Sequence, residues 1–317
     1  MSTLLEVQNL SKYFSTPKGE LHAVENVSFK LNAGETLGVV GESGCGKSTL
    51  GRTIIHLTES TAGKILFDGE DVTHPKNRGE LKSLRRQMQM IFQDPFASLN
   101  PRMTVEEIIA EPLYIYKVGS KQEIYAKIKK LMDTVGISER IANAYPHELD
   151  GGRRQRVGIA RALALEPKLV VCDEPVSALD VSIQAQILNL MQDLQEEYQL
   201  TYIFITHDMS VVKHISDHIL VMYMGCVVEY APSDILFAKR YHPYTDALLS
   251  AVPVPDIHAL RENHLLTGEV TSPLNPKPGC RFAARCPYSS QECSVKNCEL
   301  LEVEQGHFVA CHHPRSI

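Results

Sequence analysis

Gly41-Glu-Ser-Gly-Cys-Gly-Lys47-Ser48 is the stretch that decides the fold. It fits the pattern G-x-x-x-x-G-K-[ST] and lies between an apolar run predicted as a strand, Glu35 to Val40, and a run of helical character, Lys47 to Leu57. In this context the pattern binds phosphate, because backbone N–H groups surround the anion and the helix N-terminus adds partial positive charge. We expect Lys47 to reach the β- and γ-phosphates of a nucleotide and Ser48 to offer a hydroxyl to Mg²⁺. The alternative is a glycine-rich turn that contains a lysine by chance.

A pair of carboxylates complements this loop. Leu169 to Cys172 reads as a buried strand, and Asp173 and Glu174 follow it. Phosphoryl transfer needs positioning and charge neutralisation more than covalent help, so we expect Asp173 to hold Mg²⁺ and Glu174 to polarise the attacking water. Such a pair on its own is most often a solvated strand end, and its arrival after a phosphate loop favours the catalytic interpretation.

Two further polar residues follow predicted strands. Gln93 comes after Met88 to Phe92, and His207 after Tyr202 to Thr206. An open α/β sheet places its ligand crevice at the carboxyl ends of its strands, so both residues are candidates for the site. A lone histidine at a strand end is more often a structural hydrogen-bonding group, which remains the alternative for His207.

Composition limits the class of protein. The chain has 317 residues with 32 Lys plus Arg against 38 Asp plus Glu, a formal charge of −6. This balance argues against a general nucleic-acid binder, which carries a basic surface. A hydrophobic fraction of 44% and a charged fraction of 22% are ordinary for a globular protein. No apolar stretch approaches the roughly 18 to 20 residues that cross a bilayer, and no signal peptide is evident, so we expect a cytosolic protein.

The order of predicted elements indicates an α/β fold. Strand-like runs at 4–10 and 24–31 flank a turn and predict an antiparallel β edge, and residues 102–165 have helical spacing. Strand and helix alternate again from residue 169 to about 222. The pattern fades near residue 241, where prolines and cysteines predict a loop-rich C-terminal appendage. The expected domains are 1–240, with a helical subdomain at about 102–165, and 241–317.

Two more segments complete a recognisable set. Leu149-Asp-Gly-Gly-Arg153 opens a predicted helix, and Asp180 follows the acidic pair. With the loop, Gln93, the acidic pair and His207, these segments resemble the ATP-binding subunits of ABC transporters over residues 4 to about 255. The resemblance implies a P-loop NTPase with a RecA-like core, in which Glu174, His207 and Gln93 are catalytic and Gln93 joins Ser48 and Asp173 around Mg²⁺. The resemblance implies that the adenine of ATP stacks on Phe14, with Tyr13 as the runner-up. The other residues that it implies in ATP binding are Gly41, Ser43, Gly44, Cys45, Gly46, Lys47, Ser48, Thr49, Asp150, Gly151, Gly152 and Asp180.

The C-terminal segment narrows the resemblance. His242 to Pro253, Gly279 to Pro287 and Val309 to His312 look like the oligopeptide/dipeptide/nickel importer subfamily, closest to its second ATPase subunit. The resemblance implies an ATPase that energises peptide import from the cytoplasmic face of the cell membrane, to which it binds peripherally. The implied partners are a second, non-identical ATPase subunit, two transmembrane permeases and, indirectly, an extracellular binding protein, without nucleic acid. Nickel or another small solute is the alternative cargo.

The signature segment departs from the family pattern Leu-Ser-Gly-Gly-Gln, with Asp150 for Ser and Arg153 for Gln. In the family, two subunits meet head to tail, and each signature caps the γ-phosphate held by the other subunit. Asp and Ser both cap helices well, so the fold should tolerate the exchange. A carboxylate about 4 Å from a phosphate charge would repel it by roughly 4 kcal/mol before screening. We therefore expect a heterodimer with one competent and one weakened ATP site, weakened less if Arg153 pairs with Asp150.

Five of the eight cysteines lie after residue 279. They lack a C-x-x-C knuckle, so a zinc ribbon is a poor fit. The subfamily resemblance implies a [4Fe-4S] cluster on Cys280, Cys286, Cys293 and Cys311, with Cys298 spare. Zinc or another metal bound with His307, His312 or His313, and free thiols without metal, are the alternatives.

Two other functions compete with transport. A soluble ABC ATPase of DNA repair or translation would usually carry two motif sets or long helical arms, and neither is present. A regulatory subunit that senses metal and binds ATP without turnover is disfavoured by Glu174 and His207.

Overall fold

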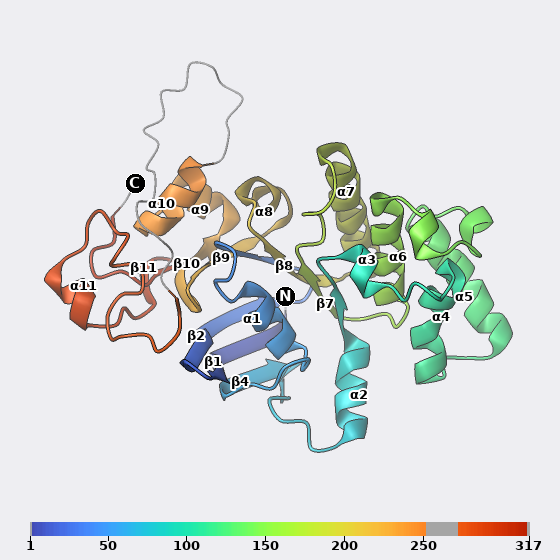
Figure 1. The fold of residues 1–317 in the computed structure, drawn as a ribbon, viewed down its shortest axis with the longest axis horizontal. Helices are drawn as coiled ribbons and strands as arrows, with labels where there is room; N and C mark the ends of the chain where they lie inside the picture. Colours follow the sequence, from blue (N-terminus) through green and yellow to red (C-terminus); the bar gives the residue numbers. More distant parts are fainter. Residues whose placement is uncertain (1, 252–271, 316–317) are drawn as a thin grey trace, which may run out of the picture. The chain divides into compact units, whose positions relative to one another are not determined.

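The computed structural model describes residues 2–251 and 272–315 and divides the chain into two units (Figure 1). The first unit comprises Met1–His74 and Phe204–Ile317, and the second comprises Pro75–Ile203. Residues 252–271, part of the predicted C-terminal extension, lie outside the described residues. In the described parts of the chain, none of the helices combines the length and the hydropathy that a bilayer-spanning segment requires.

An antiparallel sheet opens the first unit, as the sequence predicts. Strands β1 (Thr3–Thr16) and β2 (Gly19–Asn32) pair along their length, and β4 (Ala62–Phe67) and β5 (Glu70–Asp71) complete the order β2-β1-β4-β5. Both long strands extend beyond the predicted 4–10 and 24–31 because pairing continues through several register shifts to Thr16 and Gly19.

A second sheet carries the phosphate loop. Strand β3 (Thr36–Val40) is buried at every position and pairs in parallel with β9 (His218–Tyr223), as expected for an apolar strand inside an α/β fold. Helix α1 (Lys47–Ile54) follows the loop after β3, and α8 (Met209–Ile215) packs on β3. Strand β8 (Thr201–Thr206) begins in the second unit and ends in the first.

The C-terminal residues extend this second sheet. Strand β10 (Cys226–Pro232) pairs with β9, β12 (His307–Val309) pairs with β10, and β11 (Leu301–Glu304) pairs with β12, all antiparallel. The residues from 272 to 315 thus belong to the first unit. A separate Cys-rich appendage is therefore not supported, because strand pairing joins this segment to the sheet that contains β3.

Among the described residues, three helices lie just before and within the region where the sequence pattern fades. They are α9 (Ser233–Ala238), α10 (Pro243–Ser250) and α11 (Gln291–Val295). Helix α10 begins with Pro243 at its first position, and His242 caps it by accepting from the Tyr244 N–H at 3.1 Å. The prediction of a loop-rich segment did not include this helix, because proline at a helix start favours the helix that it would break further on.

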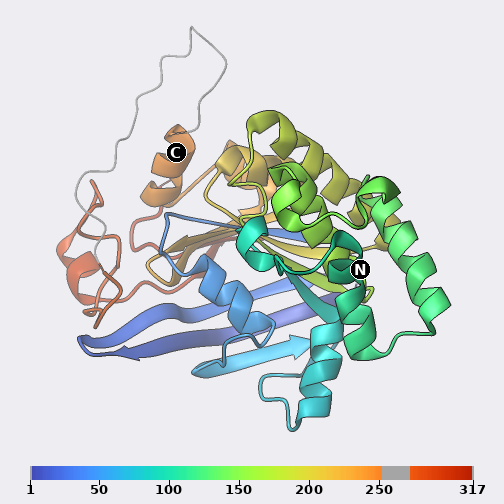
Figure 2. The ribbon, with the colours of Figure 1, turned by 45° about the vertical axis from the view of Figure 1, so that its right-hand side comes forward.

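The second unit is mostly helical. Helices α4 (Val105–Tyr116) and α5 (Lys121–Thr134) each begin with a capping box and lie beside α6 (Gly151–Leu163) in both ribbon views (Figures 1 and 2). Two buried parallel strands, β6 (Met88–Ile91) and β7 (Leu169–Asp173), pair in this unit. Its other elements are α2 (Arg78–Gln87), α3 (Pro95–Ser98), the 3₁₀ turns η1 (Glu139–Ile141) and η2 (Pro146–Glu148), and α7 (Val181–Tyr198).

Candidate functional site

Glycines give the loop after β3 its conformation. Gly46 precedes α1 with φ 107°, and a Cβ there would lie 2.0 Å from the Ala23 carbonyl oxygen. Gly44 has φ 78°, but a Cβ there would meet no heavy atom within 4 Å. Gly46 therefore allows the loop to approach β2 closely, whereas Gly44 lies beside open space on an exposed part of the loop. A loop of this kind exposes backbone N–H groups to an anion.

Lys47 lies within the loop that precedes it. Its side chain is 4% exposed, and Nζ donates to the carbonyl oxygens of Gly41 at 2.7 Å and Glu42 at 3.0 Å. Ser48 and Thr49 occupy the first turn of α1. Burial raises the pKa of the neighbouring Cys45 thiol, which therefore stays protonated at neutral pH. The ammonium group is the positive charge that a phosphate loop requires.

The second unit brings two of the predicted catalytic residues together. Asp173, the last residue of β7, is fully buried, and Glu174 follows it with φ 45°. A glutamate rarely adopts this left-handed conformation, and such residues concentrate at functional sites. Gln93, which follows β6, donates from Nε2 to Glu174 Oε2 at 2.9 Å. The ends of two parallel strands thus hold an amide and a carboxylate in contact, as expected for a crevice at the carboxyl ends of the strands.

The signature segment begins helix α6. Asp150 is the N-cap residue, and its Oδ1 accepts from the Arg153 N–H at 2.8 Å. A Cβ on Gly152 would lie 2.8 Å from Ile183 Cγ2, so the second glycine allows α6 to approach α7 closely. Asp180 is exposed and immediately precedes α7.

His207 and Phe14 lie at the edges of elements in the first unit. His207 is exposed and follows β8 directly. Phe14 lies on β1, with Lys12 Nζ 4.8 Å from its ring centroid. Its runner-up Tyr13 instead stacks on His22, with ring centroids 4.0 Å apart, and donates from its hydroxyl to Glu25. Tyr13 is thus occupied by neighbours within the protein, and adenine stacking on Phe14 stays a prediction.

The residues predicted to bind Mg²⁺ fit that ion chemically. Ser48, Gln93 and Asp173 offer hydroxyl, amide and carboxylate oxygens, which are the ligands that Mg²⁺ prefers. Ser48 belongs to the first unit and the other two to the second. Their joint ligation stays a prediction.

The prediction of an iron–sulfur cluster was wrong. Five cysteines line one small cavity: Cys280, Cys286, Cys293, Cys298 and Cys311. All eight cysteines of the chain are free thiols, and among the described residues no group of three or more His, Cys, Asp or Glu side chains is arranged to hold a metal ion. The thiols instead make contacts within the protein. A side-chain hydrogen bond joins Cys280 and Cys298, Ser290 Oγ lies 3.4 Å from Cys293 Sγ, and Cys311 Sγ accepts from the His313 N–H. The metal-binding assignment of Cys280, Cys286, Cys293 and Cys311 is therefore withdrawn.

Sequence reasoning missed a group that surrounds Glu42, the second residue of the loop. Arg285 Nη1 donates to Glu42 Oε2 at 2.8 Å, and Nη2 donates to Oε1 at 3.1 Å. The Glu42 N–H donates to the hydroxyl of Tyr244 at 2.8 Å. Both partners come from more than 200 positions away, so no local sequence signal marks them.

Two known protein families match the chain, one in its N-terminal part and one nearer its C-terminus. The family described as "ABC transporter" matches residues 24–177, and "Oligopeptide/dipeptide transporter, C-terminal region" matches residues 228–293. The chain is 50% identical to the oligopeptide transport ATP-binding protein AppF of Bacillus subtilis, over 98% of this chain and 97% of AppF. It is 51% identical to OppF, a protein of the same description and organism, over 97% of this chain and 96% of OppF.

Solved structures agree with these matches. The ATP-binding cassette MJ0796, in a dimeric post-hydrolysis state bound to ADP and Pi, is 30% identical with a TM-score of 0.67, over 73% of this chain and 99% of MJ0796. The structure of cbiO1 from Clostridium perfringens, part of an ABC transporter complex, is 28% identical with a TM-score of 0.67, over 75% of this chain and 92% of cbiO1.

Proposed function

The chain belongs to the ABC transporter family of ATP-binding subunits, and on that premise we propose that it hydrolyses ATP to drive peptide import through two permease partners. The descriptions of its relatives as oligopeptide transport ATP-binding proteins support the peptide cargo. The proposed location is the cytoplasmic face of the cell membrane. An extracellular binding protein would deliver substrate to the permeases from the opposite side of the membrane. The proposed domains are 1–240, with the helical subdomain at about 102–165, and the C-terminal extension 241–317.

In the proposed binding mode, the loop holds the phosphates. Residues 41–49 surround the β- and γ-phosphates with backbone N–H groups, and Lys47 moves its ammonium group from the loop carbonyls to the phosphate oxygens. Phe14 stacks on the adenine. Ser48, Gln93 and Asp173 would hold Mg²⁺, which would neutralise phosphate charge.

Glu174 orients the attacking water in the proposed hydrolysis step. The observation that carries this assignment is the 2.9 Å hydrogen bond from Gln93 to Glu174 Oε2. This bond orients the carboxylate at the end of β7. His207 is proposed to contact the γ-phosphate, where a positive or donating imidazole would stabilise developing charge.

We also propose that two non-identical ATPase subunits form the working dimer. Each signature segment would cap the ATP of the other subunit, so Asp150, Gly151 and Gly152 would face the partner's nucleotide, and Asp180 would lie near the dimer interface. A homodimer would place Asp150 in both ATP sites, which its charge disfavours. The competent site would be the one built on this chain's own Lys47 and Glu174.

Two substitutions test the proposed site in the assembled transporter. Lys47→Ala should abolish high-affinity binding of MgATP, because it removes the one positively charged side chain within residues 41–49. Glu174→Gln should keep ATP binding within about threefold and lower turnover by about 10²- to 10⁴-fold, the usual contribution of a positioned general base. Peptide uptake should fall in parallel with turnover.

Glu197→Gln is the matched control, since it makes the same chemical change at an exposed position of α7 in the same unit. It should hydrolyse ATP at the rate of the unaltered protein. Undiminished ATP binding by Lys47→Ala would refute the role of the loop. Undiminished turnover by Glu174→Gln would refute the role of that carboxylate.

A further inference from the structure

The phosphate loop is attached to the C-terminal part of the chain through Glu42. Tyr244 on α10 accepts a hydrogen bond from the Glu42 N–H at 2.8 Å. Arg285 donates two hydrogen bonds to the Glu42 carboxylate, at 2.8 and 3.1 Å. The backbone and the side chain of one loop residue are therefore both held by residues that are distant in sequence.

These contacts are rigid because the groups that make them are buried. Tyr244 is fully buried and Arg285 is 8% exposed. The ring of Tyr244 packs against Tyr223 and Phe282, at centroid distances of 4.7 and 5.5 Å, and Arg285 Nη1 lies 3.4 Å from the Tyr223 hydroxyl. A two-pronged arginine–carboxylate pair in such surroundings has one geometry and is stronger than a solvent-exposed pair.

The same loop residue also contacts Lys47. The Glu42 carbonyl oxygen accepts a hydrogen bond from Lys47 Nζ at 3.0 Å, on the residue whose N–H is held by Tyr244. A displacement of Glu42 would therefore move a contact of the ammonium group that is expected to bind phosphate. The position of the C-terminal segment and the position of Lys47 are linked through a single residue.

Charge gives the arrangement a second consequence. A carboxylate in a loop that binds phosphate repels the anion, and this electrostatic repulsion is larger where little water screens the two charges. The Glu42 side chain is only 24% exposed, so solvent screens it incompletely. Arg285 holds a positive charge in hydrogen-bond contact with this carboxylate. The positive charge offsets the repulsion that the carboxylate would exert on a phosphate at the loop.

We propose that Arg285 and Tyr244 are positioning residues of the ATP site, which hold Glu42 so that the phosphate loop is both correctly shaped and free of net negative charge. The inference rests on the proposed binding of nucleotide by this loop. It assigns to the C-terminal segment a part in the affinity for ATP, in addition to its place in the sheet.

The test measures KM for ATP and kcat of the assembled transporter. Arg285→Met should raise KM about tenfold with kcat changed by less than about threefold, because a loop that repels phosphate weakens binding more than chemistry. Adding Glu42→Gln to Arg285→Met should return KM to within about threefold of the unaltered protein, because the uncompensated carboxylate is then gone. The increase in KM of Arg285→Met should also shrink at high ionic strength.

Arg315→Met is the matched control, because it removes a C-terminal arginine whose guanidinium lies 4.0 Å from the Tyr288 ring and not on the loop. It should leave KM unchanged. Tyr244→Phe, which removes one hydroxyl and keeps the ring, should raise KM by about two- to fivefold, and it serves as the second variant if Arg285→Met does not assemble.

The outcomes separate this inference from the proposed function. If Lys47→Ala loses ATP binding while Arg285→Met and Tyr244→Phe retain the KM of the unaltered protein, the positioning role is refuted and the loop assignment stands. If Glu42→Gln does not rescue Arg285→Met, the charge argument is refuted. If Lys47→Ala binds ATP normally, the proposed function fails first.

Discussion

Arg153 forms an ion pair with Asp150 at the start of α6, where Arg153 Nε lies 3.3 Å from Asp150 Oδ2. The other carboxylate oxygen accepts a hydrogen bond from the Arg153 backbone. This is the i,i+3 pair that would reduce the effect of Asp150 on a partner's nucleotide. Both side chains are more than half exposed, at 57% for Arg153 and 61% for Asp150, so the neutralisation is incomplete and solvent screens it.

The first prediction concerns this charge. Asp150→Asn and Asp150→Ser should both strengthen ATP binding at the partner's site by about three- to tenfold, because each removes the negative charge. Folding stability should hardly change, since Asn and Ser cap helices as well as Asp. Equilibrium binding of a non-hydrolysable ATP analogue to the assembled transporter, with its two sites resolved, measures the effect. Arg153→Gln should act in the opposite direction, and equal affinities in all these variants would exclude an electrostatic role for Asp150.

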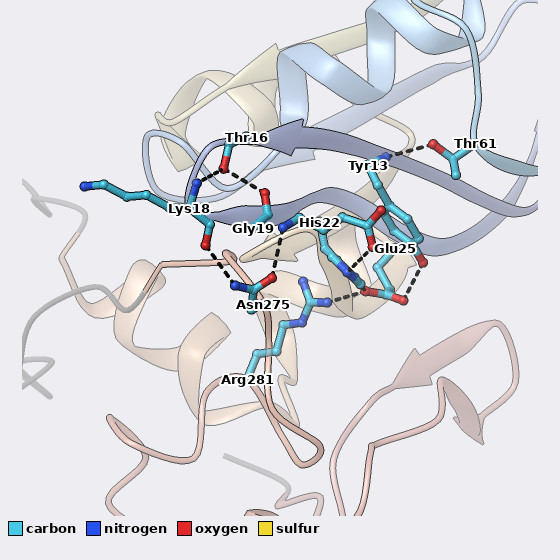
Figure 3. Close-up of polar contacts among 10 residues, drawn as sticks. Tyr13, Thr16, Lys18, Gly19, His22, Glu25, Thr61, Asn275 and Arg281 are labelled. Atoms are coloured by element: carbon cyan, nitrogen blue, oxygen red, sulfur yellow. Dashed lines mark hydrogen bonds and ion pairs between the residues drawn. The ribbon is translucent and has the colours of Figure 1, made fainter.

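The second prediction concerns the attachment of the C-terminal segment to the β1–β2 turn. Asn275 donates to the Lys18 carbonyl at 3.1 Å and accepts from the Glu20 N–H at 2.9 Å, as Figure 3 shows. Gly19 has φ 129°, and a Cβ there would lie 2.0 Å from Asn275 Nδ2. Gly19→Ala should therefore displace Asn275 and lower the free energy of unfolding by about 2–3 kcal/mol, from backbone strain and lost hydrogen bonds.

Gly69→Ala provides the comparison for that experiment. Gly69 has φ 81°, but a Cβ there would meet nothing within 4 Å, so the substitution introduces strain without a clash. It should cost only about 1 kcal/mol. Urea unfolding of both variants measures the difference, and equal losses would mean that the contact with Asn275 adds no stability.

The third prediction is a pH dependence centred on Glu25. Burial raises the pKa of this carboxyl, but hydrogen bonds from His22 and Tyr13 and the charge of Arg281 outweigh it and hold the pKa below its usual range. Figure 3 shows these partners converging on the carboxylate. Because the folded pKa is the lower one, the contribution to stability is present above about pH 4.5, the ordinary value for Glu, and is lost as pH falls through the folded pKa.

Glu25→Gln should accordingly lower the free energy of unfolding by about 1–2 kcal/mol at pH 7. The difference from the unaltered protein should disappear as the pH falls through the folded pKa and the native carboxyl becomes protonated. Glu20→Gln, on the same strand but 53% exposed, should cost less than about 0.5 kcal/mol. Urea unfolding across this pH range measures both variants, and a loss for Glu25→Gln that is independent of pH would contradict the assignment.

The fourth prediction concerns a buried carboxylate that joins β10 to the C-terminal segment. Glu229 is fully buried and accepts hydrogen bonds from the Tyr241 and His242 N–H groups, and its Oε1 lies 2.8 Å from His307 Nε2. Glu229→Ala should cost about 3–5 kcal/mol, because three groups lose their buried partner at once. Glu229→Gln keeps the shape and one carbonyl acceptor and should cost less. Urea unfolding checks the order, and an equal loss in both variants would mean that the carbonyl acceptor kept by Gln adds no stability.

Local patterns were sufficient for much of the fold. The apolar run before Gly41 forms β3, the helical run from Lys47 forms α1, and Leu169 to Cys172 lies within β7. The spacing of apolar residues in 102–165 predicted helices that the structure contains. These predictions succeeded because strand and helix periodicity depends on neighbours a few positions away. The C-terminal strands were missed because β11 and β12 are only four and three residues long.

The candidate site likewise has features that local sequence predicts and features that depend on the tertiary structure. Sequence alone determined that a phosphate loop follows a buried strand and that an acidic pair ends another, because each motif is a local run of backbone and side chains. Only the tertiary structure decided that Arg285 pairs with Glu42 across 243 positions, that Glu229 meets His307, and that the C-terminal cysteines in the described part of the chain contact one another without forming a metal site. Pairings at such separations depend on how strands pair and helices pack, so the types of the two residues do not predict them.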